Sequence, residues 1–395
     1  MEPLLGQIKH YDWGSTDAIA ELLGIRPDGR PMAEYWLGAH PGGPATLGSR
    51  RLDEVIGDNP DLLGDSAILE FDCRLPFMMK VLSAAKPLSL QAHPNRVAAQ
   101  EGFAREEAAD IPVDAAERTF KDPWDKPEVL VALTPFEALA GFRVPEETVE
   151  LFSAIGLSRQ AAEIIAPLRH RHGAAGLAEV FLDCLVLDEQ RRGAVTDVVT
   201  AAVNHVADPG PVGEFACTAV ELDEYFPGDP SLLAALLMNR RTLQPGEALH
   251  IRPGTMHAYL RGTGLEVLGS SDNVLRGGLT HKHIDPAALV QVVDFTPGPI
   301  PLLVPEPEAP GLWHYNCGER AFAVWRVDAR PGRLIDAPAE TSGRILLTTE
   351  GEIGVSTGSD ALVLPRGSAT FIKAGAEVGI SGDGVAFLAA TGIDA

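Results

Sequence analysis

The stretch PLSLQAHP at positions 87–94 gives the clearest indication of the fold of this chain. It has the look of a short buried strand that runs directly into a glutamine and a histidine two positions apart. Because alternate side chains of a strand point to the same face, Ser89, Gln91 and His93 are expected to share one. A buried amide beside a buried imidazole is costly unless both find polar partners. The stretch therefore predicts polar side chains that share a partner.

The composition of the chain indicates a large folded protein with a strongly acidic net charge. It has 395 residues, of which 45% are hydrophobic, and this is enough for more than one domain. Its 40 glycines and 31 prolines indicate many turns and a β-rich component. The net charge of −23 argues against partners such as nucleic acid or an anionic membrane, which require a basic face. A few local cations can still bind an anionic small molecule.

Cysteine usage and the N-terminal sequence bear on the cellular compartment. The four cysteines are far apart and form no C-x-x-C pair, which argues against a zinc ribbon or a dithiol redox motif. The N-terminal MEPLLGQIKHYDWGS lacks the features of a secretory leader. No apolar stretch approaches the roughly 20 residues of a membrane helix. We therefore expect a cytoplasmic protein that does not enter membranes, and we expect a monomer.

The first half of the chain changes from strand-like to helical character. In residues 1–143, the apolar runs FMMKVL (77–82), PLSL (87–90) and EVLVAL (128–133) have the length of strands. Residues 144–239 begin with a proline and two glutamates, a typical helix start, and continue with apolar residues at helical spacing. We interpret this second segment as a helical insert.

Strand character returns in the second half of the chain. Residues 240–317 contain two Pro-Gly turns, at 245–246 and 253–254, which are typical of a β-meander or barrel. Residues 318–395 alternate short apolar runs with glycine turns, as in a small sandwich or jelly roll. The sequence thus predicts a mainly β protein with an α-helical insert, in which the segments before and after the insert form one domain.

Three segments supply residues of the types that bind metals. The first holds Gln91 and His93, the second holds Glu128 with Lys126 two positions before it, and the third holds His257 after a Pro-Gly turn. Two imidazoles, one carboxylate and one amide oxygen form a suitable ligand set for zinc. Spacing alone leaves the ordinary alternatives open: a polar pair at a strand end, a surface ion pair, and a turn histidine bonded to backbone.

These segments resemble the type I mannose-6-phosphate isomerases (phosphomannose isomerases) of the cupin superfamily. The resemblance covers the first three-quarters of the chain in the family's order. It rests on YDWGS (11–15), PLSLQAHP (87–94), KPEVLVAL (126–133), FEALAGFR (136–143), YFPGDPSLLAALLMN (225–239), PGTMHAYL (253–260) and GLEVLGSSDNVLRGGLTHKHID (264–285). It implies a cupin (jelly-roll) catalytic barrel, a helical domain and a second, C-terminal jelly roll.

The resemblance assigns the ligands that spacing left open. It implies that Gln91, His93, Glu128 and His257 bind Zn²⁺, with the sugar phosphate as the small-molecule partner. The implied reaction interconverts mannose 6-phosphate and fructose 6-phosphate through an enediol. Zinc and a fixed cation can stabilise the negative charge that develops on oxygen. Arg276, in SDNVLRGG, is the cation that the resemblance provides.

A general base is also required, and the sequence leaves its identity open. Glu266 matches a pocket carboxylate of the family, Lys126 shares a strand face with Glu128, and a metal-bound water is the third candidate. Asp272 is expected nearby, as an orienting group or a hydroxyl acceptor.

The phosphate group requires cations and hydroxyl groups. Lys86 and Ser89 flank the metal-binding strand, and Lys282 follows Arg276 by six positions at a family pocket position. We expect all three to contact the phosphate. Trp13, in YDWGS, is expected to form a wall against the sugar. The H-K-H run at 281–283 is a weaker metal candidate, because no third ligand is evident.

One departure from the family affects the rim of this site. The family usually has N-H-K-P-E, whereas this chain has W-D-K-P-E, with Trp124 and Asp125 before the metal-binding glutamate. Two other functions remain for comparison: a cupin that senses sugar phosphate and zinc without turnover, and an iron-dependent cupin oxygenase. A complete acid–base set argues against the sensor, and a glutamine and a lysine at these positions fit iron chemistry less well.

Overall fold

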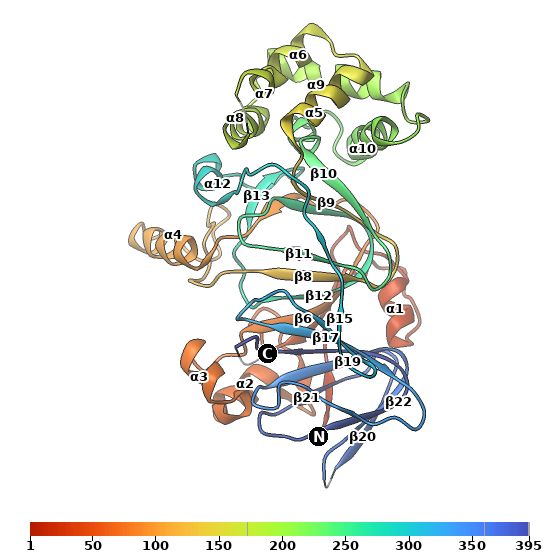
Figure 1. The fold of residues 1–395 in the computed structure, drawn as a ribbon. Helices are drawn as coiled ribbons and strands as arrows, with labels where there is room; N and C mark the ends of the chain where they lie inside the picture. Colours follow the sequence, from red (N-terminus) through yellow and green to blue (C-terminus); the bar gives the residue numbers. More distant parts are fainter. Residues whose placement is uncertain (172, 359, 394–395) are drawn as a thin grey trace.

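Two antiparallel sheets of eleven strands each and a group of helices make up the protein (Figure 1). The computed structural model describes residues 1–171, 173–358 and 360–393. Figure 1 shows the helical group at one end of an elongated molecule, the sheet of C-terminal strands at the other end, and the remaining sheet between them. The expectation of a mainly β protein with added helices is therefore confirmed.

The central sheet is built from both segments that flank the helical insert. Its strands are β2 (Gln7–Lys9), β3 (Glu34–Gly38), β6 (Phe77–Ala84), β7 (Leu90–Ala92), β8 (Glu128–Ala132), β9 (Phe136–Phe142), β10 (Met238–Leu243), β11 (Ala248–Ile251), β12 (His257–Gly269), β13 (Leu275–Gly278) and β14 (Leu302–Leu303). The long strand β12 joins its two parts. Its first residues pair with β7 and β9, and its later residues pair with β6 and β8.

The alternation of side chains gives the central sheet two different faces. On β6, Met79 and Val81 point to a core that also contains Ile345 and Phe387 from the second sheet. Lys80 lies between them in the sequence and therefore points to the opposite face. The register extends this face across the sheet, because Lys80 is paired with Trp36 on one side and with Glu266 on the other. One face thus packs the two sheets together, and the other carries buried polar side chains beside a separate hydrophobic cluster that contains Leu82 and Leu130.

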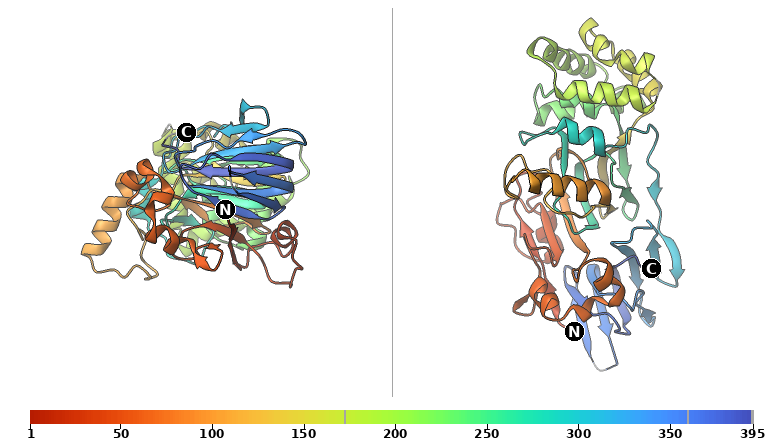
Figure 2. Two further views of the ribbon diagram at one scale, coloured as in Figure 1. Left: turned by 90° about the horizontal axis from the view of Figure 1, so that it is seen from below. Right: turned by 90° about the vertical axis from the view of Figure 1, so that its left-hand side faces the viewer.

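The second sheet combines C-terminal strands with strands from the start of the chain. It contains β1 (Pro3–Leu5), β4 (Thr46–Leu47), β5 (Arg50–Arg51), β15 (Glu306–Ala309), β16 (Leu312–Tyr315), β17 (Ala323–Ala329), β18 (Ile335–Asp336), β19 (Arg344–Ser356), β20 (Ala361–Pro365), β21 (Ala369–Ile372) and β22 (Gly379–Ala390). Strand β1 pairs with β21, so that Leu4 lies opposite Ala369. The start of the chain therefore lies in the sheet of C-terminal strands, and the right-hand view of Figure 2 shows the N-terminus beside these blue strands. The domain boundaries after residues 143, 239 and 317 stay predictions.

Most helices lie in the segment that the sequence marks as helical. Those between β9 and β10 are α5 (Pro145–Ile155), α6 (Arg159–Ile165), α7 (Pro167–His170), α8 (Ala174–Leu185), α9 (Glu189–Val203), α10 (Pro211–Tyr225) and α11 (Ser231–Ala235). The others are α1 (Ala18–Leu23), α2 (Leu52–Asp58), the 3₁₀ helix η1 (Pro60–Leu63), α3 (Asp65–Glu70), α4 (Arg96–Ala108) and α12 (Pro286–Val292). Buried residues of the helical group pack with Leu90 and Ala92 of β7, which leaves Gln91 pointing the other way. Among the described residues, no helix is long and apolar enough to cross a membrane.

Two local expectations differ from the structure. The strand expected over residues 87–90 begins only at Leu90, because Pro87 cannot donate to a neighbouring strand and the chain turns after β6. Before it, the Leu88 N–H donates to the Tyr259 carbonyl over 2.8 Å. The segment 297–311 looks like a proline-rich linker, yet it contributes β14 to one sheet and β15 to the other.

Candidate active site

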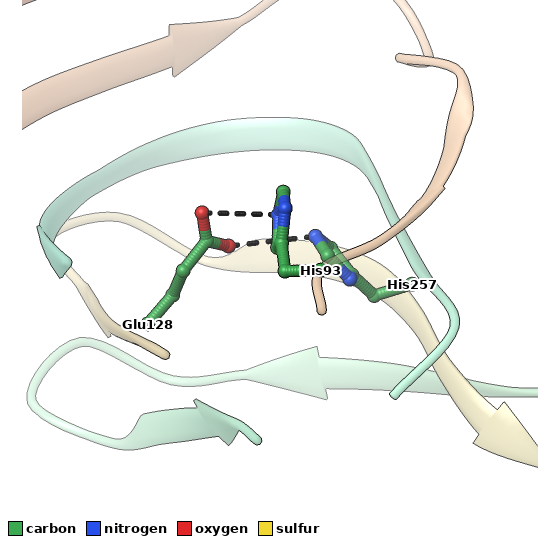
Figure 3. Close-up of side chains that lie close together, drawn as sticks. All are labelled: His93, Glu128 and His257. Atoms are coloured by element: carbon green, nitrogen blue, oxygen red, sulfur yellow. Dashed lines mark ion pairs between the residues drawn. The ribbon is translucent and has the colours of Figure 1, made fainter. Parts of the chain in front are cut away.

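His93, Glu128 and His257 meet in the interior of the central sheet (Figure 3). His93 Nε2 lies 3.2 Å from Glu128 Oε1, and His257 Nε2 lies 3.4 Å from Glu128 Oε2. The ligand atoms of the three residues all lie within 4.8 Å of one another. Glu128 begins β8, His257 begins β12, and His93 directly follows β7. Three segments that are far apart in sequence thus supply three buried metal-binding side chains.

Both imidazole rings are oriented by backbone carbonyl groups. His93 Nδ1 lies 2.7 Å from the Asn273 carbonyl oxygen, and His257 Nδ1 lies 3.1 Å from that of Thr255. These contacts turn both Nε2 atoms toward the carboxylate. His93 Nε2 is buried and has no hydrogen-bond partner. A metal ion held between this nitrogen and the Glu128 carboxylate would satisfy it, and histidine–carbonyl contacts are typical of metal sites. The donor set fits zinc.

Gln91 lies beside this cluster. It is directly opposite His257 in the pairing of β7 with β12, and opposite Arg276 in the pairing of β7 with β13. Its amide nitrogen donates to Ser89 Oγ over 3.2 Å, so the amide nitrogen rather than the oxygen is engaged there. The structure therefore places the fourth predicted ligand next to the other three.

The charges around Glu128 keep it ionised and keep His93 neutral. Lys126 Nζ lies 3.0 Å from Glu128 Oε1. Burial alone raises the pKa of Glu128, but Lys126 and His93 outweigh it and hold that pKa well below its usual range. Burial, together with the charge of Lys126, lowers the pKa of His93 to about 4. A carboxylate and a neutral imidazole are the forms that bind metal.

A second buried cluster lies on the same face of the sheet. Lys80 Nζ is 3.6 Å from Glu266 Oε2 and 3.7 Å from Glu34 Oε1, and Tyr259 donates to Glu266 Oε1 over 3.0 Å. Burial alone lowers the pKa of Lys80, but the two carboxylates outweigh this and raise it. The pKa of Glu266 is raised to about 7, because burial and the charge of Glu128 outweigh the effect of Lys80. Glu266 can therefore accept and release a proton near neutral pH.

Arg276 lies on β13 at the edge of a cavity of about 490 Å³. Its Nη1 donates to Ser89 Oγ over 3.3 Å, which links it to Gln91 through the same hydroxyl group. Asp272 and Lys282 also line this cavity. Asp272 is exposed and lies 3.4 Å from His40 Nε2, which lowers the pKa of this aspartate.

The two remaining predicted residues, Trp13 and Lys86, differ in how they lie relative to the metal-binding residues. Trp13 is half-buried, packs against the cluster that contains Leu82 and Tyr259, and stacks on Tyr11 with the ring centres 5.7 Å apart. Lys86 is exposed in the turn after β6, and among the described residues its side chain forms no hydrogen bond or ion pair with this centre. The structure thus brings Trp13 to the polar face and leaves Lys86 outside the cluster.

The two unusual residues before Lys126 form the rim of the site. Trp124 contacts two guanidinium groups, with Arg96 Cζ 3.5 Å and Arg74 Cζ 4.5 Å from its ring centre. Asp125 lies 3.6 Å from Arg96 Nη1. The Trp124 carbonyl oxygen accepts from Asn273 Nδ2 over 2.8 Å. These contacts tie the segment that carries Lys126 to α4 and to the loop before β13.

Known proteins have a similar sequence and a similar fold. The profile described as "Phosphomannose isomerase type I, catalytic domain" matches residues 1–145. The mannose-6-phosphate isomerase of Escherichia coli K12 is 36% identical over 384 residues, which are 95% of each chain. The chain therefore belongs to the type I phosphomannose isomerase family.

More distant relatives and solved structures agree with this membership. The mannose-6-phosphate isomerase of Homo sapiens is 30% identical over 96% of this chain and 94% of its own. The zinc-bound crystal structure of a mannose 6-phosphate isomerase superimposes with a TM-score of 0.88 and 35% identity over 99% of both chains. The apo form from Salmonella typhimurium gives a TM-score of 0.88 at 36% identity over 99% of both chains. The predicted family and enzyme class, an isomerase, are confirmed.

The sequence motifs do not predict a functional role for four polar residues near the site: Glu34, Lys80, Lys121 and Tyr259. The first two had a detectable signal. Lys80 is the single charged residue of the buried strand FMMKVLSA, and Glu34 begins the buried strand EYWLG. A charge in a strand buried along its whole length requires a partner on the same face. Lys121 and Tyr259 carried no comparable signal, since one lies in a loop and the other reads as a core aromatic.

Proposed function

We propose that this protein is a zinc-dependent aldose–ketose isomerase that interconverts mannose 6-phosphate and fructose 6-phosphate through an enediol intermediate. The observation that carries the proposal is the convergence of His93, Glu128 and His257 next to a carboxylate, Glu266, whose pKa is raised to about 7. A metal site beside a group that can transfer protons at neutral pH is what an isomerisation through an enediol requires.

His93, Glu128 and His257 would hold the zinc ion, and Gln91 would complete the set through its amide oxygen. When bound, zinc supplies a Lewis acid that polarises the oxygen atoms of the open-chain sugar. The residues support this role, because the His93 imidazole is neutral, the Glu128 carboxylate is ionised and His93 Nε2 has no hydrogen-bond partner.

Glu266 is proposed as the general base that moves a proton between C2 and C1 of the sugar. Its pKa of about 7 balances the ability to remove a proton against the ability to return it. Tyr259 and Lys80 fix both of its oxygen atoms. Lys126 is a less suitable base, because its ammonium group forms an ion pair with Glu128.

Arg276 and Lys126 are proposed to stabilise the negative charge of the enediolate. Arg276 is partly buried, and burial lowers its pKa without changing its charge at neutral pH. A guanidinium that Ser89 already orients loses little freedom when charge develops on the substrate.

The phosphate is proposed to lie at the far side of Arg276. Lys282 lines the same cavity as Arg276, and Ser89 accepts a hydrogen bond from Arg276, whereas Lys86 would have to reach in from its exposed turn. Trp13 would pack against the sugar, and Asp272 would accept a hydroxyl hydrogen. A non-catalytic sensor would need neither Glu266 nor its buried partners, so the enzyme is favoured.

Two finer features complete this proposal. We infer that the sheets are jelly rolls of the cupin type, a view that the entirely antiparallel pairing of their strands supports. We infer a cytoplasmic location from the chemistry of the cysteines. All four are free thiols, which is typical of proteins from a reducing compartment.

The isomerisation can be tested by NMR in deuterated water. The protein should convert mannose 6-phosphate to fructose 6-phosphate, and deuterium should enter C1 of the product because the base exchanges its proton with solvent. Product without deuterium after many forward and reverse cycles would point to a hydride shift. Absence of conversion by the metal-loaded protein would refute the function altogether.

A further inference from the structure

The cavity beside Arg276 is lined by a further cationic side chain, Lys121, to which the proposed function assigns no role. Arg276, Lys282 and Lys121 all line it, and they come from β13, from the turn after β13 and from the loop before β8. None of the three forms an ion pair within the described parts of the chain. The protein has 55 acidic and only 32 basic lysine and arginine residues, so unpaired cations are expensive to gather. Three of them around one cavity indicate an anionic ligand.

The cations are close enough to influence one another. The pKa of Lys282 is lowered most by the positive charge of Arg276, then by burial, and then by the charge of Lys121. His281 and His283 also line the cavity, whereas the guanidinium group of Arg118 is already bound to Glu106 and Glu107. The acidic residues Asp272 and Asp285 are also engaged, by His40 and by the N-terminus of α12, and Asp114 is the remaining carboxylate of the lining.

The backbone of Lys121 is fixed relative to the metal site. Its N–H donates to Asn273 Oδ1 over 2.7 Å. Asn273 is fully buried, and its carbonyl oxygen is the group that orients the His93 ring. It also lies three positions before Arg276. A single residue thus sets the positions of Lys121, Arg276 and His93 relative to each other, which suits a substrate that spans the metal site and the cavity.

We propose that Lys121 binds the phosphate group of the substrate, together with Arg276 and Lys282, and thereby selects phosphorylated over free sugars. This inference rests on the proposed function for the identity of the sugar. The cation cluster by itself calls only for a compact dianion, and inorganic phosphate has the same chemistry. Lys121 contributes to the affinity for the phosphate and not to the proton transfer at the other end of the sugar.

Steady-state kinetics of Lys121→Met and Lys121→Arg test the inference. Loss of one charge-assisted contact is expected to raise KM for mannose 6-phosphate by about tenfold while kcat stays within about twofold. Lys121→Arg should recover most of the affinity. Lys373→Met, which removes an exposed lysine of the second sheet's domain, is the matched control and should leave KM unchanged. An unchanged KM in Lys121→Met would overturn the inference.

A binding measurement separates this inference from the proposed function. Inorganic phosphate should raise the melting temperature of the wild-type protein, and Lys121→Met should weaken this effect about tenfold in phosphate concentration. The measurement does not depend on turnover. If the wild-type protein binds phosphate through Lys121 but does not isomerise the sugar, the proposed function fails and the inference stands. Equal stabilisation of both proteins by phosphate would contradict the inference even in an active isomerase.

Discussion

The ammonium group of Lys80 lies 3.6 Å from a carboxylate oxygen of Glu266 in the interior of the central sheet. The two residues are directly opposite each other in the pairing of β6 with β12, so strand register alone brings them together. Glu34 accepts the same ammonium group from the other side, at 3.7 Å. One buried cation thus balances two buried carboxylates, one of which we propose to be the general base.

Substitution of this cation is expected to destabilise the protein. Lys80→Met leaves Glu34 and Glu266 buried without their cation, which should lower the free energy of unfolding by about 3–5 kcal/mol. Urea denaturation of Lys80→Met, with Lys373→Met as the control, measures the effect. A loss below about 0.5 kcal/mol, the size of an ordinary surface substitution, would show that the ammonium group does not compensate these charges.

The pH dependence of turnover should report on Glu266. The base is active when ionised, so kcat/KM should rise as the pH increases through the pKa of Glu266, about 7 without metal and lower once a cation is bound beside it. Tyr259→Phe removes a hydrogen bond that favours the ionised carboxylate. The variant's acidic limb should therefore move to higher pH, by about one unit. A limb that stays in place or moves to lower pH would exclude Glu266 as the group that sets it.

Arg276 should matter for turnover rather than for folding. Arg276→Ala removes a partly buried side chain that donates a hydrogen bond to Ser89, so the melting temperature should change little. Loss of the charge that stabilises the enediolate should lower kcat by about 10²–10³-fold. Assays of kcat together with zinc content by mass spectrometry test this expectation. Near-wild-type turnover in the variant would refute the charge-stabilisation argument.

The tryptophan at the rim gives a stability prediction. Trp124 contacts two guanidinium groups, and Trp124→Phe keeps a ring for both while Trp124→Ala keeps none. We expect the alanine variant to lose about 1–3 kcal/mol of unfolding free energy and the phenylalanine variant less than half of that. Urea denaturation of the two variants decides the point, since equal losses would mean that the stacked arrangement contributes nothing.

The metal site could be predicted because its residues stand in short, recognisable motifs. Gln91 and His93 share one motif, and Glu128 and His257 each begin a strand directly after a proline-containing turn or loop. Side-chain alternation then predicts which of them face inward. Convergence itself depends on the pairing of β7, β8 and β12, which the motifs do not specify.

The rest of the site could not be predicted because it depends on long-range strand register. Nothing near Lys80 in the sequence shows that Glu266 lies opposite it, 186 positions later. The pairing of β1 with β21 joins residues from the two ends of the chain and has no local signal either. Lys86 is expected at the phosphate because it flanks the metal-binding strand. The structure shows it exposed in the turn after β6, and its contact with the phosphate stays a prediction.

The role of the metal ion can be measured most directly by removal and controlled return of zinc. Protein stripped with a chelator, and verified by mass spectrometry to be metal-free, should lose isomerase activity. Activity should return in proportion to added zinc and reach its maximum at about one ion per chain, as expected for a single site with four protein ligands. His93→Ala should bind no zinc at this stoichiometry. Full activity in verified metal-free protein would contradict the account.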